Sequence, residues 1–410
     1  MDGRTPHQDP TWVRLVNEGA VAPLVGDAMR PLRRERLMGE ACAITGLDDF
    51  GPDDFLAPLD LLLADLEEHA ALTVVGRWQT HRYLQRLLRG RLQLVDALRR
   101  DPGIADEVID RPILVAGAPR TGTSILHALL ALDPAHRAPT GWELLLPAPP
   151  PRPHTHDDDP RIELADAELR FPDTVGGAGS MDAIHLYGAR LPKECLSAHS
   201  FAFRSQEFPA RYHVPNYTRW LLDEADMTPA YAMHRLVLRT LQRHFPPGRR
   251  WVLKSPVHLH SLDVVRATYP DATVVVTHRD PLTVLGSVTS LIAALRAVHG
   301  DGVEFAALGR YHADLYFADL DGLVDADPTR TAFRHVSYTD LVTEPVRALR
   351  ALYAGLDAPF DAAAEERVTA YLAERPKDRH GAHRYAFEDL GLDRTEQRAR
   401  FARYREHFDV

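Results

Sequence analysis

Residues 112–126 read Pro-Ile-Leu-Val-Ala-Gly-Ala-Pro-Arg-Thr-Gly-Thr-Ser-Ile-Leu, and this stretch decides the fold. Its apolar run 113–115 is typical of a strand that is buried on both faces of a parallel sheet. The segment 117–122 interrupts that pattern, and the residues from Ser124 onward predict a helix. A strand, a glycine-bounded loop and a helix N-terminus form a place where backbone N–H groups and the helix dipole favour a bound phosphate.

The loop departs from the pattern of nucleotide triphosphatases. Gly117 and Gly122 have the spacing of a phosphate-binding loop, but Thr123 stands where those enzymes have a lysine. The nearest cation, Arg120, lies inside the loop instead. We therefore expect a phosphate site without the lysine that serves a β/γ-phosphate pair. At this point a turn without a ligand is the alternative.

Composition limits the class of protein. The chain has 410 residues, of which 45% are hydrophobic and 26% charged, as in soluble globular enzymes. A net charge of −10 argues against nucleic acid or a heparin-like polymer as a general partner. Two cysteines without a C-x-x-C pair predict neither a disulfide framework nor a zinc motif. The sequence shows no signal peptide and no apolar run of membrane-spanning length, so we expect no membrane span and a cytoplasmic location.

Residues 1–110 predict a helical N-terminal region. Apolar residues recur there at three- and four-residue spacings, interleaved with charged residues, most clearly in 61–66, 83–88 and 92–98. No chemical motif is visible in this region. We expect a helical layer that packs on the main domain, residues 111–410, or on a second subunit of a homodimer.

Two further strands follow the pattern of a parallel sheet. Residues 250–256 and 272–280 each contain a short apolar run, and a helix of about a dozen residues separates them, which makes a βαβ unit. Lys254 and Arg279 stand at the carboxyl ends of these strands, where open α/β sheets bind ligands. Together with Arg120 they place three cations at three strand ends, an arrangement that self-repulsion disfavours unless an anion binds.

The remaining blocks complete the predicted architecture. Pro281 opens a helix that carries Ser287, and a strand at 333–336 leads into Tyr338. Residues 377–385 are rich in Lys, Arg, His and Gly, which fits either a cationic lid or a polar loop. The predicted fold class is α/β: a P-loop-like three-layer fold with a central parallel sheet, plus the N-terminal helical layer.

The chain resembles sulfotransferases that use 3′-phosphoadenosine 5′-phosphosulfate (PAPS), in the large bacterial branch related to carbohydrate and tyrosylprotein sulfotransferases. The first family signature stands here as Pro119-Arg-Thr-Gly-Thr-Ser124. The resemblance implies that this segment binds the 5′-phosphosulfate, with contributions from Arg120, Thr121, Gly122, Thr123 and Ser124. The second signature, an arginine at a strand end with a serine eight residues later, is matched by Arg279 and Ser287 and implies a 3′-phosphate site.

Further blocks extend the similarity over most of the chain. Residues 253–256, 338–342 and 380–385 resemble segments of this branch. By resemblance, the adenine contacts Tyr338, and the last block adds the cofactor-binding residues His380, His383 and Arg384. The chain departs from the cytosolic branch, because it has no lysine before the Thr-Gly of its loop and no Arg-Lys-Gly with Gly-x-x-Gly near its end. Residues 144–220 match no motif and are expected to form the acceptor pocket as an insertion.

The chemistry of the residues agrees with this resemblance. In-line sulfuryl transfer spreads charge over equatorial oxygens and builds charge on the leaving phosphate, so positioning and cations provide most of the catalysis. We expect Arg120 and the loop N–H groups to hold the 5′-phosphate and Lys254 to reach the bridging oxygen. PAPS has no triphosphate to chelate, so we expect no metal.

The acceptor hydroxyl needs a base within hydrogen-bond reach. Glu143 follows the loop helix at a distance similar to that of the catalytic glutamate in the tyrosylprotein enzymes, and its aromatic and aliphatic neighbours favour a pKa raised by desolvation. The alternative for Glu143 is a carboxylate paired with a structural arginine. His258 and His260 are further candidates for the base.

The sequence therefore predicts a sulfotransferase that moves the sulfuryl group of PAPS to a hydroxyl of a small-molecule, lipid or carbohydrate acceptor. Two alternatives remain at this point, a nucleotide kinase or NTPase and a non-catalytic nucleotide-binding protein. Activity that depends on magnesium and ATP would distinguish a kinase or NTPase from a sulfotransferase. Nucleotide binding without turnover would distinguish a non-catalytic binding protein. The identity of the acceptor cannot be predicted from the sequence.

Overall fold

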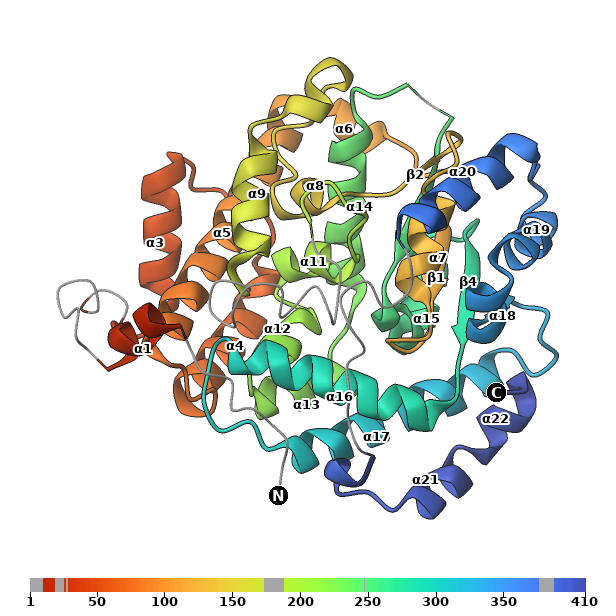
Figure 1. Cartoon of the computed structure of the whole chain (residues 1–410). Helices are drawn as coiled ribbons and strands as arrows, with labels where there is room; N and C mark the ends of the chain where they lie inside the picture. The colour runs from red at the N-terminus through yellow and green to blue at the C-terminus, as the bar shows by residue number, and fades with distance from the viewer. Residues whose placement is uncertain (1–9, 19–25, 27–28, 173–187, 247, 376–386) are drawn as a thin grey trace.

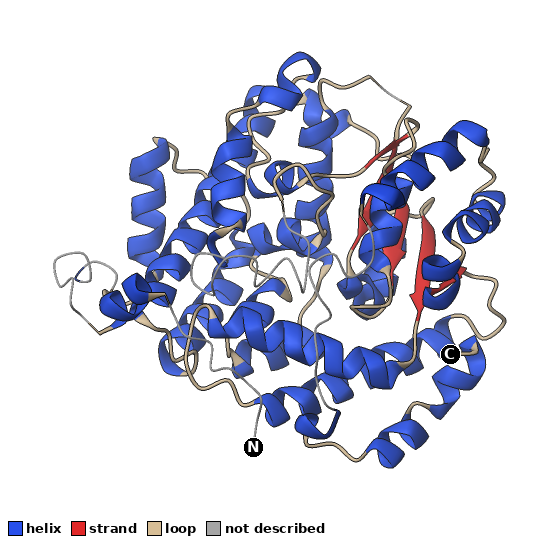
Figure 2. Cartoon of the chain, in the orientation of Figure 1, coloured by secondary structure: helices blue, strands red, loops and turns tan. Residues whose placement is uncertain are grey.

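The computed structural model contains a five-stranded, all-parallel sheet with helices on both of its faces (Figure 1). Figure 2 shows how small the sheet is beside the helices that surround it. The structure describes residues 10–18, 26, 29–172, 188–246, 248–375 and 387–410. The strands are β1 (Ile113–Ala116), β2 (His136–Arg137), β3 (Arg250–Lys254), β4 (Thr273–His278) and β5 (Arg334–Ser337).

The strand order β2-β3-β1-β4-β5 places the loop-bearing strand β1 in the middle. Val115 of β1 pairs with Lys254 of β3 on one side and with Val275 of β4 on the other. At the next boundary His278 of β4 pairs with Ser337 of β5. Because the strands are parallel and in this register, the carboxyl ends of β1, β3, β4 and β5 meet at one edge of the sheet.

Alternate residues of β1 face two separate cores. Ile113 and Val115 pack in one apolar cluster with the loop helix, and Leu114 and Ala116 belong to a second, much larger one. This alternation is expected for a strand that is covered on both faces. The first face is covered by α7 (Thr123–Leu130), α18 (Tyr338–Thr343), α19 (Pro345–Gly355) and α20 (Ala362–Glu374). The predicted three-layer α/β fold is confirmed.

The second face meets the larger layer of helices (Figure 1). Trp251 and Leu253 of β3 and Val276 of β4 enter the same apolar cluster as the helices of this layer. These helices are α11 (Leu196–His199), α12 (Glu207–Arg211), α13 (Pro215–Asp223), α14 (Thr228–Gln242), α15 (Leu262–Thr268), α16 (Pro281–Ala297) and α17 (Phe305–Ala326), with the 3-10 helices η3 (Ser200–Ala202) and η4 (Pro256–Ser261).

The described part of residues 1–110 adds helices to this same core. Its elements are α1 (Thr11–Asn17), α3 (Arg34–Thr45), η1 (Asp53–Phe55), α4 (Leu56–Glu68), α5 (Val74–Arg100) and α6 (Gly103–Asp106). The three predicted apolar segments lie in α4 and α5. Helix α5 begins where the Thr73 hydroxyl accepts the Gly76 N–H, and its Leu84, Leu87 and Leu88 are completely buried. The domain boundary at residue 110 stays a prediction.

The remaining elements lie in the segment after α7 and at the end of the chain. They are α8 (Gly141–Leu145), η2 (Pro153–Asp158), α9 (Arg161–Leu169), η5 (Phe387–Leu390), α21 (Arg394–Arg400) and α22 (Ala402–Phe408). The two-residue strand β2 was not predicted, because two residues carry no periodicity. Across the described residues, none of the helices has the length and apolarity that crossing a membrane requires.

Three buried histidines form a cluster behind the carboxyl end of β3. His199, His234 and His258 come from α11, α14 and η4, and their ring centroids lie 5.4–6.4 Å apart. Hydrogen bonds join His258 Nδ1 to the Tyr231 hydroxyl (2.8 Å) and His234 Nδ1 to the Tyr269 hydroxyl (2.6 Å). Burial lowers the pKa of His199 from 6.5 to about 3, and burial also lowers the pKa of His234 and of His258 well below 6.5. All three imidazoles are therefore neutral at physiological pH.

This cluster predicts acid sensitivity. Because His199 is neutral in the fold but binds a proton near pH 6.5 when unfolded, its contribution to stability is complete above pH 6.5. That contribution falls by about 1.4 kcal/mol per pH unit as the pH drops toward the folded-state pKa. His199→Phe should therefore flatten the pH dependence of the unfolding free energy, measured by urea denaturation from pH 7 to about 4. The exposed His154→Phe serves as control, and equal slopes in wild type and His199→Phe would contradict the argument.

Candidate active site

The backbone of the loop after β1 has positive φ angles at three positions, a conformation that few residues other than glycine adopt. Gly122 has φ +93° and Gly117 has φ +133°. A Cβ at Gly117 would lie 2.4 Å from Thr277 Oγ1, so the close approach of β4 excludes a side chain there. Arg120 also has a positive φ, +69°. Left-handed conformations outside glycine are uncommon and concentrate at functional sites, where the surrounding structure enforces them.

A hydroxyl pair holds this strained loop against the sheet. Thr121 is buried, and its hydroxyl hydrogen bonds with the Ala118 carbonyl oxygen (2.6 Å) and with Thr277 Oγ1 of β4 (2.6 Å). The side chain of Thr121 therefore supports the loop. Gly122 and Thr123 come next, and α7 begins at Thr123 with its first backbone N–H groups at the sheet edge. The structure thus forms the strand–loop–helix unit that the sequence predicts.

Arg120, Arg279 and Ser287 lie together beside this loop. Arg120 Nε donates to Ser287 Oγ at 3.0 Å, and Arg279 donates to the Arg120 carbonyl oxygen at 2.7 Å. The Arg279 guanidinium also lies 4.0 Å from the centroid of the Tyr338 ring. The structure therefore brings together four of the predicted cofactor residues from β1–α7, the end of β4, α16 and the start of α18.

Lys254 lies at the carboxyl end of β3 and reaches the loop helix. It is only 2% exposed, and its ammonium donates to Ser124 Oγ at 3.2 Å. It also forms an ion pair with the carboxylate of Glu194. A buried ammonium requires such partners, because an unpaired charge in this position carries a large desolvation penalty. The pair thus places an ammonium and a carboxylate beside the first turn of the loop helix.

Backbone hydrogen bonds on both sides fix the position of Glu194. The N–H of Lys193 donates to the Pro139 carbonyl oxygen, and the N–H of Cys195 donates to the carbonyl oxygen of Lys254 itself, each at 2.9 Å. The predicted base list did not include Glu194. The sequence around it, Leu-Pro-Lys-Glu-Cys, shows no periodicity. Only its position, as a carboxylate within the segment expected to form the acceptor pocket, indicates that Glu194 could be a base.

A cavity of about 420 Å³ opens beside the Lys254–Glu194 pair. Its walls are mostly apolar and come from α7, α12, α16, α17 and the segment before α11. His127 also lines the cavity, and its imidazole is neutral because burial lowers its pKa to about 3. Apolar lining residues include Ile125, Leu191, Val288, Leu291, Ile292 and Leu295. Part of this wall comes from residues 144–220, although their status as an insertion stays a prediction.

Glu143 is surrounded by hydrogen-bond donors, contrary to the expected apolar surroundings. Its carboxylate accepts hydrogen bonds from Arg137 (2.7 Å), from the Thr140 N–H (2.9 Å) and from the Thr140 hydroxyl (3.0 Å), and it contacts His156 at 3.1 Å. This is the capping box of α8. Burial opposes the charged form, but the His156 hydrogen bond and the Arg137 charge prevail and lower the pKa of Glu143 to about 2. The expected raised pKa is wrong, and the alternative, pairing with a structural arginine, is what the structure shows.

His258 and His260 also lie away from the cavity at Lys254. His258 belongs to the buried cluster described above. His260 is held between Asp319 (2.9 Å) and the Leu222 carbonyl oxygen (3.0 Å). It lines a separate cavity of about 540 Å³ between α13 and α17. The predicted residues His380, His383 and Arg384 lie outside the residues that the structure describes.

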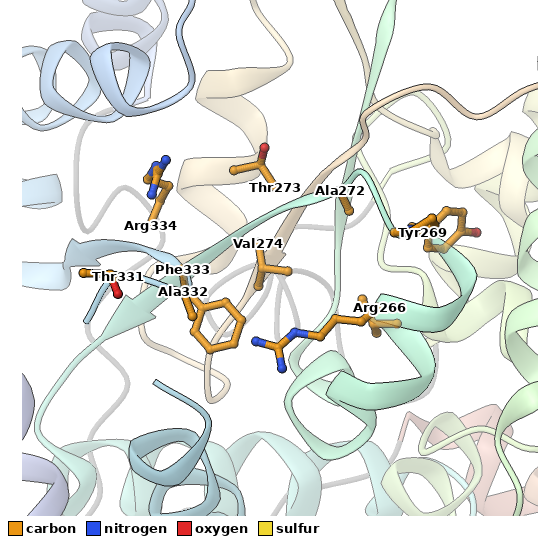
Figure 3. A pocket seen from close by; sticks show the side chains of 11 residues that line it. Arg266, Tyr269, Ala272, Thr273, Val274, Thr331, Ala332, Phe333 and Arg334 are labelled. Carbon is orange, nitrogen blue, oxygen red and sulfur yellow. The ribbon is translucent and has the colours of Figure 1, made fainter. Parts of the chain in front are cut away.

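A shallow groove at the opposite edge of the sheet has no such chemistry. Figure 3 shows the groove, which lies at the amino ends of β4 and β5 and has a volume of about 460 Å³. Arg266 lies over the Phe333 ring at 5.0 Å. No paired acid and base accompany it among the labelled side chains. In the portion of the chain that the structure covers, no three His, Cys, Asp or Glu side chains are arranged to hold a metal ion.

The central strand of this parallel sheet runs through a glycine loop into a helix, and cations lie at three strand ends. This arrangement defines an α/β protein with a P-loop-like fold. A family model described as the sulfotransferase family matches residues 112–362, more than half of the chain. The chain belongs to the sulfotransferase family.

Individual relatives agree with this assignment. The omega-hydroxy-beta-dihydromenaquinone-9 sulfotransferase Stf3 of Mycobacterium bovis is 29% identical over 306 residues, which span 70% of this chain and 74% of that protein. The crystal structure of sulfotransferase STF1 from Mycobacterium tuberculosis H37Rv is 31% identical, with a TM-score of 0.78 over 91% of this chain and 99% of that one. Sulfotransferase STF9 from Mycobacterium avium gives 28% identity and a TM-score of 0.82, over 92% and 97% of the two chains.

The position of Glu143 predicts a loss of stability in Glu143→Gln with little loss of catalysis. The amide leaves Arg137 without its buried anionic partner, so the unfolding free energy should fall by about 3–5 kcal/mol in urea denaturation. Turnover per folded molecule should stay within a few-fold of wild type. The exposed Glu163→Gln in α9 is the control. Unchanged stability with turnover reduced by about 100-fold or more would return Glu143 to the role of base.

Proposed function

We propose that this sulfotransferase moves the sulfuryl group of PAPS to the hydroxyl of an apolar small-molecule acceptor. The observation that carries the proposal is the Lys254 ammonium, which contacts Ser124 of the phosphate-binding loop and Glu194 at the same time. Ser124, Lys254 and Glu194 all line the apolar cavity, and Ser124 lies in the first turn of the loop helix, where we expect the phosphate to bind. Donor and acceptor would therefore meet at this pair.

The groups around the loop suit a donor with two separate phosphates. The N–H groups at the start of α7 and the Arg120 guanidinium would hold the 5′-phosphosulfate. Arg279 and Ser287 both contact Arg120, so a second phosphate on the ribose would find its own cation and hydroxyl there. Tyr338, already against Arg279, offers a ring for the adenine.

The reaction follows from the chemistry of the pair. Glu194 accepts the proton of the acceptor hydroxyl as the acceptor oxygen forms a bond to sulfur. The bond between sulfur and the bridging oxygen breaks, and its electron pair stays on the leaving 5′-phosphate. Protonation neutralises Glu194 and weakens its attraction for Lys254. The ammonium is then available to the bridging oxygen at the stage when negative charge builds there. The products are the sulfate ester, 3′-phosphoadenosine 5′-phosphate and a proton.

Two observations favour an apolar acceptor. The cavity beside Glu194 is lined mostly by Leu, Ile and Val side chains, which favour aliphatic surface over a carbohydrate. The mycobacterial relative is named for a menaquinone-derived hydroxyl acceptor. Against the kinase alternative, the loop has Thr123 in place of lysine. Against a non-catalytic binding protein, Glu194 supplies a base at the junction of the two sites.

Arg279→Ala tests the donor. The variant should bind 3′-phosphoadenosine 5′-phosphate more weakly by about 2–5 kcal/mol, since a phosphate that is withdrawn from water loses its cation. AMP, which lacks the 3′-phosphate, should bind wild type and variant almost equally in calorimetry. AMP is therefore the internal control for damage to the loop or to Tyr338. Equal losses for both nucleotides would show that Arg279 supports the loop and does not read the 3′-phosphate.

Glu194→Gln tests the base. Turnover of decanol with PAPS should fall by about 10²–10⁴-fold, while the affinity for 3′-phosphoadenosine 5′-phosphate stays close to wild type. The acidic limb of the pH–rate profile should disappear, because the titrating carboxylate is absent. Glu143→Gln, normalised to folded protein, is the matched control for loss of a buried carboxylate. Turnover of Glu194→Gln within a few-fold of wild type would exclude this assignment.

A further inference from the structure

Most charged side chains that line the acceptor cavity are already neutralised by a partner. Glu207 and Arg211 of α12 form an ion pair at 2.7 Å, and the Ser200 hydroxyl donates to the second Glu207 oxygen at 3.0 Å. Glu207 and Arg211 therefore contribute no net charge to the cavity, and their hydrogen bonds are made within the protein.

The other ionic residues of the cavity follow the same rule. Lys254 is paired with Glu194, as described above. Arg375 at the rim contacts Glu374 at 3.4 Å. Arg86, which lies close behind the wall, pairs with Glu168 at 2.7 Å. Each of these cations has a carboxylate of its own.

Lys193 differs from all of them. Its side chain lines the cavity, yet no ion pair or hydrogen bond joins its ammonium to another residue in the described ranges. Burial lowers the pKa of Lys193, while the charge of Glu207 opposes that effect. Because Glu207 is already paired with Arg211 and Ser200, the three N–H donors of Lys193 are available to a molecule that occupies the cavity.

Its backbone leaves Lys193 little freedom to turn away. The Lys193 N–H donates to the Pro139 carbonyl oxygen, and the adjoining Pro192 forms a β-bridge with Thr140. An acceptor that fills the cavity displaces water from the ammonium, and an aliphatic surface cannot replace those hydrogen bonds. An oxygen of the acceptor can replace them.

We propose that Lys193 is a specificity-determining residue that binds a second oxygen of the acceptor, a carbonyl or carboxylate oxygen, while the acceptor hydroxyl lies at Glu194. Lys193 and Glu194 both line this cavity, and consecutive Cα atoms are about 3.8 Å apart, so one small acceptor can contact both side chains. The acceptor class is therefore an aliphatic alcohol with a carbonyl or carboxylate group at the same end of the molecule. This inference rests on the proposed function and narrows its acceptor.

Binding of matched acceptors tests the inference independently of turnover. Calorimetry would compare β-hydroxydecanoate, its methyl ester, the ε-hydroxy isomer and the secondary alcohol of equal length that lacks the second oxygen, each with and without bound 3′-phosphoadenosine 5′-phosphate. Wild type should bind the best oxygen-bearing compound about 10- to 100-fold more tightly than the plain alcohol. Preference for the acid over the ester identifies a carboxylate, and equal binding of both identifies a carbonyl.

Variants of Lys193 then assign the preference to its ammonium. Lys193→Met keeps the length of the side chain but removes the charge, and it should abolish the preference while leaving binding of the plain alcohol unchanged. Lys193→Arg should restore part of it. Arg190→Met, an exposed cation in the same segment, should retain the full preference of wild type.

Three outcomes would overturn the inference: absence of any preference in wild type, a preference that survives in Lys193→Met, or equal loss of turnover for every alcohol in that variant. The last result would show that Lys193 acts on Glu194 and not on the acceptor. Failure of the proposed function is a separate result. It would appear as absence of binding to 3′-phosphoadenosine 5′-phosphate, whereas the preference between acceptors is measured in its own titration, with or without that nucleotide.

Discussion

The site is organised by the ion pair between Lys254 and Glu194. The buried Lys254 ammonium is stable only with an anionic partner, and the partly exposed carboxylate of Glu194 provides one, so the pair constrains both segments that deliver it. Lys254 comes from the end of β3 and contacts Ser124 on the loop helix. Glu194 comes from a distant segment whose next residue, Cys195, donates to the carbonyl oxygen of that same lysine. The sheet edge, the loop helix and the apolar cavity are therefore linked through a single contact.

The parallel sheet explains why the cations gather where they do. Strands in one direction and one register bring their carboxyl ends to a common edge, so residues far apart in the chain become neighbours. Strand ends can be located in a sequence from apolar runs and the polar residues that follow them. For this reason the sequence predicted the α/β fold, the loop, Lys254 and the neighbourhood of Arg279 and Ser287. The sulfotransferase family assignment agrees with that prediction.

Residues positioned by long-range contacts were beyond the reach of sequence patterns. Glu194 depends on backbone bonds to Pro139 and Lys254, and neither contact leaves a periodic trace. For Glu143 the sequence shows the apolar neighbours, which favour a raised pKa. It does not show that Arg137 and His156 contact the carboxylate. The spacing of Thr140 and Glu143 is that of a capping box, and this local signal favours a structural role. Burial raises a carboxyl pKa only where no donors compensate it, and donors are a property of the fold.

One helix joins the two halves of the site. Ser287 of α16 faces the loop cations, and Leu291, Ile292 and Leu295 of the same helix line the acceptor cavity. These residues belong to one helix. A substitution that changes side-chain volume on the cavity side and tilts α16 therefore also moves Ser287 relative to the loop cations. An engineer who wishes to reshape the cavity for a new alcohol should therefore leave α16 intact. The wall formed by residues 191–196, which lies outside the proposed nucleotide site, is the better place for redesign, provided that Glu194 is kept.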